Sequence, residues 1–149
     1  MYHGRKGDAC RKVTNEELLA LECDILVLSA KENEVTEKNA GNIKAKLVVE
    51  LANGPVTPEA DEILEGRGID VIPDILANSG GVTVSCFEWQ QNLKKESWSD
   101  EEVRAKLEDI MVPAYLRVSE LKGKYNTSYR TAAFISAMMR LEEAISQKL

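Results

Sequence analysis

The chain reads LVVELANGPVTPEAD from Leu47 to Asp61, and this stretch holds the clearest evidence of its fold. A short apolar run over 47–51 is typical of a buried β-strand. The sequence Asn53-Gly54-Pro55 then predicts a turn. Thr57, followed by Pro58 and acidic residues, has the form of a helix N-terminus. A strand, a turn and a helix in this order predict one repeat of an α/β fold.

Two further apolar runs of the same kind lie on either side, at 25–29 and 69–72. The three runs begin at Ile25, Leu47 and Ile69, each 22 residues after the one before. This spacing fits a strand, a crossover and a second parallel strand. Because the runs are nearly continuous in apolar residues, we expect strands that are covered on both faces.

Helices are predicted before, between and after these strands. The first follows a capping box at Thr14, a short one covers 36–43, and the one from Thr57 ends at Gly66 or Gly68. After residue 78 the apolar period is about 3.6, which predicts a wholly helical segment. We expect its helices to cover 82–95, after the Gly80-Gly81 pair, then a long stretch from the capping box at Ser99, and 129–149. Pro113 is expected to kink or interrupt the long stretch.

Composition and charge exclude several classes of protein. The 149 residues carry a net charge of −6, which disfavours nucleic acid and anionic membranes as partners. The apolar runs are too short to span a bilayer, and no secretory signal is visible at the start. Three cysteines (Cys10, Cys23 and Cys86) without CxxC spacing favour reduced thiols and a cytoplasmic location. With a single histidine, His3, we expect no metal site and no Ser-His-Asp triad.

Two segments resemble a known family. Residues 44–61 and 71–89 are similar to the C-terminal half of the nucleotide-binding domain of glutamate dehydrogenase, in the Glu/Leu/Phe/Val dehydrogenase superfamily. The likeness continues in 129–134 and 14–19. It implies an α/β fold: a partial Rossmann-like unit with three parallel strands and a C-terminal helical segment, forming a single truncated NAD(P)-binding domain over residues 1–149. It also implies an oxidoreductase that deaminates glutamate to 2-oxoglutarate and ammonia, with NAD or NADP as cofactor.

The resemblance also implies which residues bind ligands. Ser29 and Ala30 would flank the adenosine ribose, and Asn53 would lie near the ribose and nicotinamide. Asn78 would contact the carboxamide or the substrate carbonyl. On the helix that follows, Val82 and Ser85 would line the substrate pocket, and Ser85 would bind the side-chain carboxylate of glutamate.

Fold geometry supports the two asparagines independently. Ligands of open parallel sheets bind beyond the carboxyl ends of the strands, where Asn53 and Asn78 are expected. An amide side chain both donates and accepts, so it can recognise a carboxamide in one orientation. Gly80 and Gly81 would let the backbone approach the ligand. Without the family likeness, the same motifs are typical of ordinary turn and helix-cap structure.

The sequence lacks two parts of such an enzyme. Its nine glycines form no Gly-x-Gly-x-x-Gly turn for a pyrophosphate. No glycine-flanked lysine of the family's catalytic type occurs, so no catalytic residue is assigned. Leu51 stands where the family usually has glycine. We therefore expect the chain alone to be inactive and to bind dinucleotide weakly or not at all.

An alternative is a non-enzymatic oligomerising or partner-binding α/β module. Strand 25–29 would form an apolar edge, because the strand that normally pairs with it is not among these residues. Such an edge would self-associate or pair with a chain that supplies the missing lobe. A response-regulator-like domain is disfavoured, because Asp24 lies at the start of a strand and not at its end.

Overall fold

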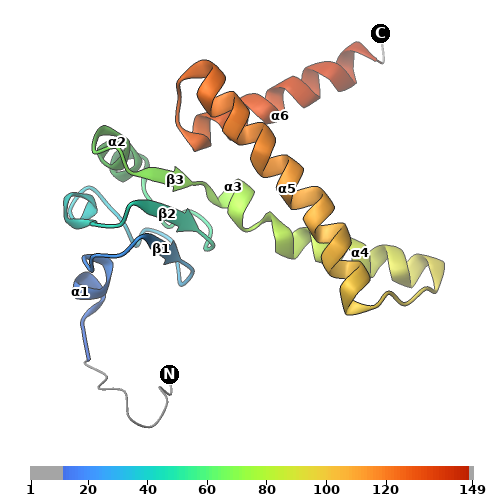
Figure 1. Cartoon of the computed structure of the whole chain (residues 1–149), viewed down its shortest axis with the longest axis horizontal. Coiled ribbons are helices and arrows are strands. Elements are labelled where there is room, and N and C mark those ends of the chain that lie inside the picture. Colours follow the sequence, from blue (N-terminus) through green and yellow to red (C-terminus); the bar gives the residue numbers. More distant parts are fainter. Residues whose placement is uncertain (1–11, 148–149) are drawn as a thin grey trace.

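A computed structural model describes residues 12–147 and shows an open sheet with helices around it (Figure 1). The strands are β1 (Ile25–Leu28), β2 (Leu47–Glu50) and β3 (Asp70–Ile72), in the order β1-β2-β3. Both neighbouring pairs are parallel. The predicted α/β class and the three parallel strands are confirmed. Strands β1 and β2 each end one residue earlier than predicted, because the N–H groups of Leu51 and Ala52 both donate to the carbonyl of Leu28, where the ladder gives way to a turn. Strand β3 ends at Ile72 as predicted but begins one residue later, at Asp70.

Short helices flank the sheet. They are α1 (Asn15–Leu19), the 3₁₀ helix η1 (Ala40–Asn42), α2 (Pro58–Gly66) and α3 (Asp74–Ala77). The capping box at Thr14 is present, and Thr57 caps α2 by accepting from the N–H of Ala60. The predicted helix over 36–43 is wrong except for η1. The rest of this segment is a turn held by the side chain of Asn39, which accepts from the N–H of Thr36 and donates to the carbonyl of Glu34.

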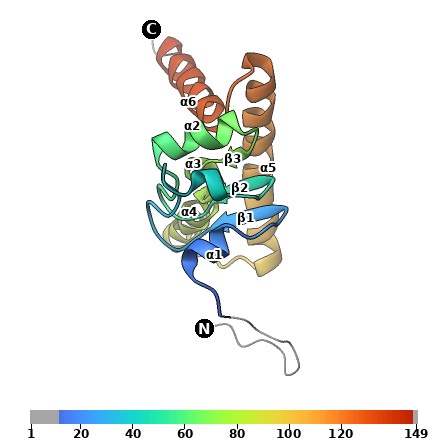
Figure 2. The ribbon, with the colours of Figure 1, turned by 90° about the vertical axis from the view of Figure 1, so that its left-hand side faces the viewer.

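Three long helices form the rest of the chain, and the views agree that α5 and α6 lie beside the β3 side of the sheet (Figures 1 and 2). They are α4 (Ser79–Lys94), α5 (Asp100–Tyr125) and α6 (Tyr129–Ser146). The prediction that α4 follows Gly80 and Gly81 is wrong, since both lie in its first turn. Packing against α5 offsets the low helix propensity of glycine there.

The long helix α5 continues through Pro113, so the predicted interruption is wrong. Proline removes one backbone hydrogen bond and crowds the preceding turn. Along its length, α5 packs on both α4 and α6, and this tertiary packing holds the helix together across the proline.

Two clusters of buried side chains form the core. One lies between the sheet, α2 and η1 and includes Val48, Ile43 and Leu64. The other joins α3, α5 and α6 through Leu76, Val118, Leu121, Ala132 and Ala133, and Ile72 of β3 packs against it.

Coverage of the sheet is unequal. On one face, Leu28, Val48 and Val71 are buried. On the other face, Ile72 packs against the second cluster, but Ile25 and Val27 of β1 are 56% and 47% exposed. The prediction that the strands are covered on both faces is therefore wrong at β1, because α5 and α6 cover only the β3 side.

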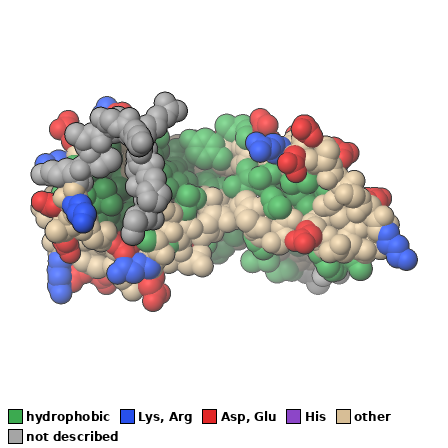
Figure 3. Space-filling view, turned by 90° about the horizontal axis from the view of Figure 1, so that it is seen from below, with side chains coloured by type: hydrophobic (Ala, Val, Ile, Leu, Met, Phe, Trp, Pro, Cys, Tyr) green, Lys and Arg blue, Asp and Glu red, His purple; other side chains and the backbone are tan. Residues whose placement is uncertain are grey.

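Apolar side chains are also exposed on the long helices, as the view from below shows between charged groups (Figure 3). No helix within residues 12–147 is long and apolar enough to cross a membrane. In the same range, no group of His, Cys, Asp and Glu is arranged to hold a metal ion. Cys10 and His3 lie outside the described residues.

Candidate functional site

Two asparagine side chains meet at the carboxyl edge of the sheet. Asn53 lies in the turn that follows β2, and Asn78 joins α3 to α4. Nδ2 of Asn78 donates a hydrogen bond of 2.7 Å to Oδ1 of Asn53. The structure thus brings together two residues that the sequence analysis placed in one crevice.

This contact leaves two complementary atoms at the sheet edge. Nδ2 of Asn53 and Oδ1 of Asn78 have no hydrogen-bond partner among residues 12–147. One is a donor and the other an acceptor. A primary carboxamide carries the matching acceptor and donor, so the pair is suited to bind one in a single orientation. This donor and this acceptor together therefore fit the carboxamide group of a nicotinamide cofactor.

Local geometry holds the turn that carries Asn53. Gly54 has a φ of 55°, a conformation that glycine adopts without the cost of a side chain. Its carbonyl accepts from the N–H of Asn33, and the N–H of Val35 donates to the carbonyl of Pro55. The N–H of Gly54 donates to Oδ2 of Asp74 at 2.8 Å. These bonds tie the turn to two other segments of the chain.

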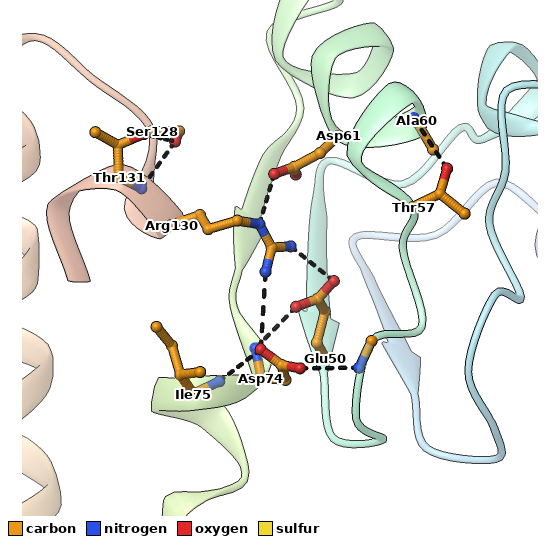
Figure 4. A network of polar contacts seen from close by, with 10 residues as sticks. Glu50, Thr57, Ala60, Asp61, Asp74, Ile75, Ser128, Arg130 and Thr131 are labelled. Carbon is orange, nitrogen blue, oxygen red and sulfur yellow. Dashed lines mark hydrogen bonds and ion pairs between the residues drawn. The ribbon is translucent and has the colours of Figure 1, made fainter. Parts of the chain in front are cut away.

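A buried ion-pair network lies directly behind the turn (Figure 4). The carboxylate of Glu50, at the end of β2, has no exposed side-chain surface. Its Oε1 accepts from Nη2 of Arg130 at 2.8 Å, and its Oε2 accepts from the N–H of Asp74 at 2.8 Å. Nε of Arg130 donates to Asp61 at 2.6 Å. The carboxylate of Asp74 lies 3.7 Å from Nη1 of the same guanidinium.

The network keeps Arg130 charged despite its burial. Burial opposes the charged form, but hydrogen bonds and attraction from Glu50 and Asp61 outweigh it and raise the pKa of Arg130 above its ordinary value. One side chain of α6 thereby joins β2, α2 and α3.

Sequence reasoning missed this network. Glu50 and Arg130 both lie in segments that were compared with the family, but neither received a role. The signal in the sequence was the alternation of side chains between the two faces of a strand, which places Glu50 on the same buried face of β2 as Val48. A carboxylate on a buried face requires a cationic or hydrogen-bonding partner.

The other predicted site residues are more dispersed. Ser29 and Ala30 are exposed at the carboxyl end of β1, on the same edge as Asn53. Val82 and Ser85 are exposed in the first two turns of α4, and Val82 is 69% exposed. No side-chain hydrogen bond within residues 12–147 joins these four residues to Asn53 or Asn78. A Cβ atom added at Gly80 would meet the side chain of Leu107 on α5 at 3.8 Å.

A large groove lies elsewhere in the described chain. It has a volume of about 750 Å³ between α3, α5 and α6, and its walls include Ile75, Arg117 and Arg140. Neither Asn53 nor Asn78 lines it. The candidate site therefore rests on the paired amides and their support, and not on cavity size.

Comparison with known proteins agrees with the fold. The family model described as Glutamate/Leucine/Phenylalanine/Valine dehydrogenase matches residues 2–148. The chain belongs to this dehydrogenase family.

Within the family, its relatives in sequence include several glutamate dehydrogenases. The chain is 55% identical over 137 residues to the glutamate dehydrogenase of Thermotoga maritima, which covers 92% of this chain and 33% of the relative. It is 50% identical over 132 residues to the cryptic catabolic NAD-specific glutamate dehydrogenase of Bacillus subtilis, covering 89% and 31%. The chain thus spans about a third of the length of these relatives.

Solved structures show the same relationship. The glutamate dehydrogenase of Peptoniphilus asaccharolyticus superposes with a TM-score of 0.77 at 43% identity, covering 82% of this chain and 31% of that one. The Leu-bound hetero-hexameric glutamate dehydrogenase of Thermus thermophilus gives a TM-score of 0.86 at 34% identity, covering 97% and 35%.

Proposed function

We propose that this chain forms the C-terminal part of the nucleotide-binding domain of an NAD(P)-dependent glutamate dehydrogenase. The observation that carries the proposal is the Asn53–Asn78 amide pair at the carboxyl edge of a parallel sheet. The names of the sequence relatives support glutamate as the substrate, and three of them are NAD-specific enzymes. The reaction would be oxidative deamination of glutamate to 2-oxoglutarate and ammonia.

The roles proposed for the site residues rest on the family resemblance, and their positions and chemistry are compatible with it. Bound NAD or NADP would supply the hydride acceptor. Nδ2 of Asn53 and Oδ1 of Asn78 would hold the carboxamide of the cofactor and so fix which face of its ring meets the substrate. Ser29 and Ala30 would flank the adenosine ribose. Val82 and Ser85 would line the substrate side, where the Ser85 hydroxyl can donate to a carboxylate.

We further propose that residues 1–149 form a single truncated cofactor-binding domain. By itself, this domain would not turn over glutamate. The sequence offers no Gly-x-Gly-x-x-Gly turn for the pyrophosphate. It also offers no candidate lysine of the kind that the reaction needs. The chain would contribute the nicotinamide end of the site to a larger assembly. A cytoplasmic location for that assembly remains a prediction.

Complementation tests this function. The 149-residue chain is mixed with a polypeptide that carries the remaining two thirds of the Thermotoga maritima relative, and light scattering verifies that they assemble. We expect glutamate-dependent reduction of NAD or NADP by the mixture but not by the chain alone. Asn53→Ala and Asn78→Ala should each lower the activity by about tenfold or more, because a buried ligand amide loses its partner.

Asn92→Ala is the matched control, since Asn92 is exposed on α4, away from the sheet edge. It should leave the activity unchanged. Turnover of about 1–10³ s⁻¹ by the chain alone would contradict the proposed dependence on a partner. An assembled mixture in which all three asparagine variants behave alike would contradict the proposed site.

A second candidate, self-association without catalysis, is supported by β1. Among the described strands β1 pairs on one side only, and its Ile25 and Val27 side chains are exposed. An unpaired apolar edge favours addition of another chain. The partner would be a second copy or a polypeptide that supplies the rest of the sheet. One structural neighbour is itself a hetero-hexamer.

A further inference from the structure

Asp74 is connected to both asparagines of the candidate site. Its Oδ2 accepts from the N–H of Gly54, the residue directly after Asn53, at 2.8 Å. It is also the first residue of α3, the single turn of helix whose C-cap is Asn78. The N–H of Asn78 donates to the carbonyl of Asp74 at 3.0 Å. One residue therefore contacts the turn that carries Asn53 and the backbone that carries Asn78.

Asp74 is itself held from two directions. Its N–H donates to the buried carboxylate of Glu50, and its Oδ1 faces the guanidinium of Arg130 at 3.7 Å. Glu50 and Arg130 are joined by a hydrogen bond of 2.8 Å. Since Glu50 is fully buried and Arg130 bonds to two elements, neither can shift without breaking other contacts. The support behind the amide pair is therefore held by polar contacts on both sides.

We propose that Asp74 is a positioning residue that sets the separation and orientation of the Asn53 and Asn78 amides, and that Glu50 and Arg130 hold it in place. Asp74 has no need to touch the ligand. Its effect on binding or turnover would pass through the two asparagines. This inference rests on the proposed function for the identity of the ligand, but the geometry that it describes is a property of the chain alone.

Asp61 provides a matched control. It also forms a carboxylate contact with Arg130, at 2.6 Å, but it lies on α2 and has no hydrogen bond to Gly54 or Asn78. Asp61→Ala and Asp74→Ala each remove one acidic partner of the same guanidinium. Only Asp74→Ala removes the acceptor of the Gly54 N–H. A difference between the two variants at the amide pair therefore isolates the positioning role from general loss of stability.

The first measurement uses the 149-residue chain without ligand. NMR resonances of the Asn53 and Asn78 side-chain amides are assigned by their loss in Asn53→Asp and Asn78→Asp. In Asp74→Ala we expect the Asn78 amide to shift toward the position of a free, solvated amide, whereas Asp61→Ala leaves it in place. Asp74→Asn keeps an oxygen for the Gly54 N–H and should largely restore the original resonance.

Arg130→Lys serves as a milder variant, because it keeps the charge and loses only the two-pronged guanidinium geometry. It should shift the Asn78 amide in the same direction as Asp74→Ala, by less. Unchanged amide resonances in both Asp74→Ala and Arg130→Lys would overturn the inference. Equal shifts in Asp61→Ala and Asp74→Ala would overturn it as well.

The second measurement brings in the ligand. In the complemented enzyme, Asp74→Ala should raise the KM for NAD or lower kcat by about tenfold or more, because misplaced contacts lose alignment with the reacting ring. Asp61→Ala should change neither by more than about twofold. Titration of the complemented enzyme with nicotinamide mononucleotide reports directly on the asparagine amides. If those amides do not respond to the mononucleotide in the assembly but do respond to Asp74→Ala, the positioning role stands and the proposed ligand fails.

Discussion

Glu50 and Arg130 are 80 positions apart in the sequence, yet Nη2 of Arg130 donates to the carboxylate of Glu50 at 2.8 Å. The Glu50 side chain is fully buried, and 26% of the Arg130 side chain is exposed. The pair links the last residue of β2 to the first turn of α6. It therefore couples the sheet to the C-terminal helices, and its loss has consequences for both.

Removing the arginine should destabilise the chain strongly. Arg130→Met leaves the buried Glu50 carboxylate without its cation, which we expect to lower the free energy of unfolding by about 3 kcal/mol. The double variant Glu50→Leu with Arg130→Met should recover much of that loss, because no buried charge remains. Urea denaturation measures both. Lys46→Met is the control, since its ion pair with Asp24 is about 80% exposed on both sides and contributes less than about 0.5 kcal/mol. A loss in Arg130→Met no larger than in this control would contradict the prediction.

Two glycines at and just after the end of α2 should respond oppositely to substitution by alanine. Gly68 has a φ of 74°, which a Cβ atom disfavours, so Gly68→Ala should cost about 1 kcal/mol. Gly66 is the last helical residue, and a Cβ there would meet no atom within 4 Å. Gly66→Ala should therefore stabilise the chain by up to about 1 kcal/mol through reduced entropy of the unfolded state. Thermal unfolding of the two variants side by side tests this contrast, and equal shifts in Tm would refute it.

Acid should weaken the contact between α1 and the loop at Glu34. A hydrogen bond from Asn15 at 2.7 Å, helped by Lys31, lowers the pKa of Glu34 although partial burial opposes this. A carboxylate with a lowered folded pKa adds stability above its unfolded pKa of about 4.3, and that stability is lost as the pH falls through the folded value. Glu34→Gln should reduce stability at neutral pH and flatten its dependence in this acidic window.

Denaturation from about pH 7 down to about pH 3 measures this dependence. Glu37→Gln is the control, because Glu37 is exposed three residues further on. If the two glutamine variants follow the same curve, Glu34 does not contribute to the acid sensitivity of the fold.

The exposed face and edge of β1 should cause self-association. Val27 is 47% exposed on this strand, and we expect Val27→Lys to shift the chain toward monomer at high concentration because a lysine disfavours edge pairing. Val112→Lys makes the same substitution at a valine of similar exposure, 46%, on α5. It should leave the association through β1 unchanged. Light scattering across a concentration series distinguishes the variants. A monodisperse monomer that Val27→Lys does not affect would rule out pairing through this strand.

Local features were predictable from the residues themselves. The starts of α1, α2 and α5 follow from Thr14, Thr57 and Ser99, because a capping side chain needs only a backbone N–H two or three residues away. The three parallel strands follow from their apolar runs and even spacing. The convergence of Asn53 and Asn78 follows too, since parallel strands end at one edge of the sheet.

Contacts between distant segments required the folded chain. Whether Pro113 breaks its helix depends on how α5 packs against its neighbours, and no local pattern records that. The half-covered sheet depends on which side α5 and α6 occupy. The partner of Glu50 is contributed by a helix far along the sequence. The alternation of buried and exposed side chains in β2 could therefore reveal only that Glu50 needs a partner. Short-range hydrogen bonding and apolar periodicity act within a few residues and can be read in order, whereas charge pairing and helix packing depend on distances that exist only after folding.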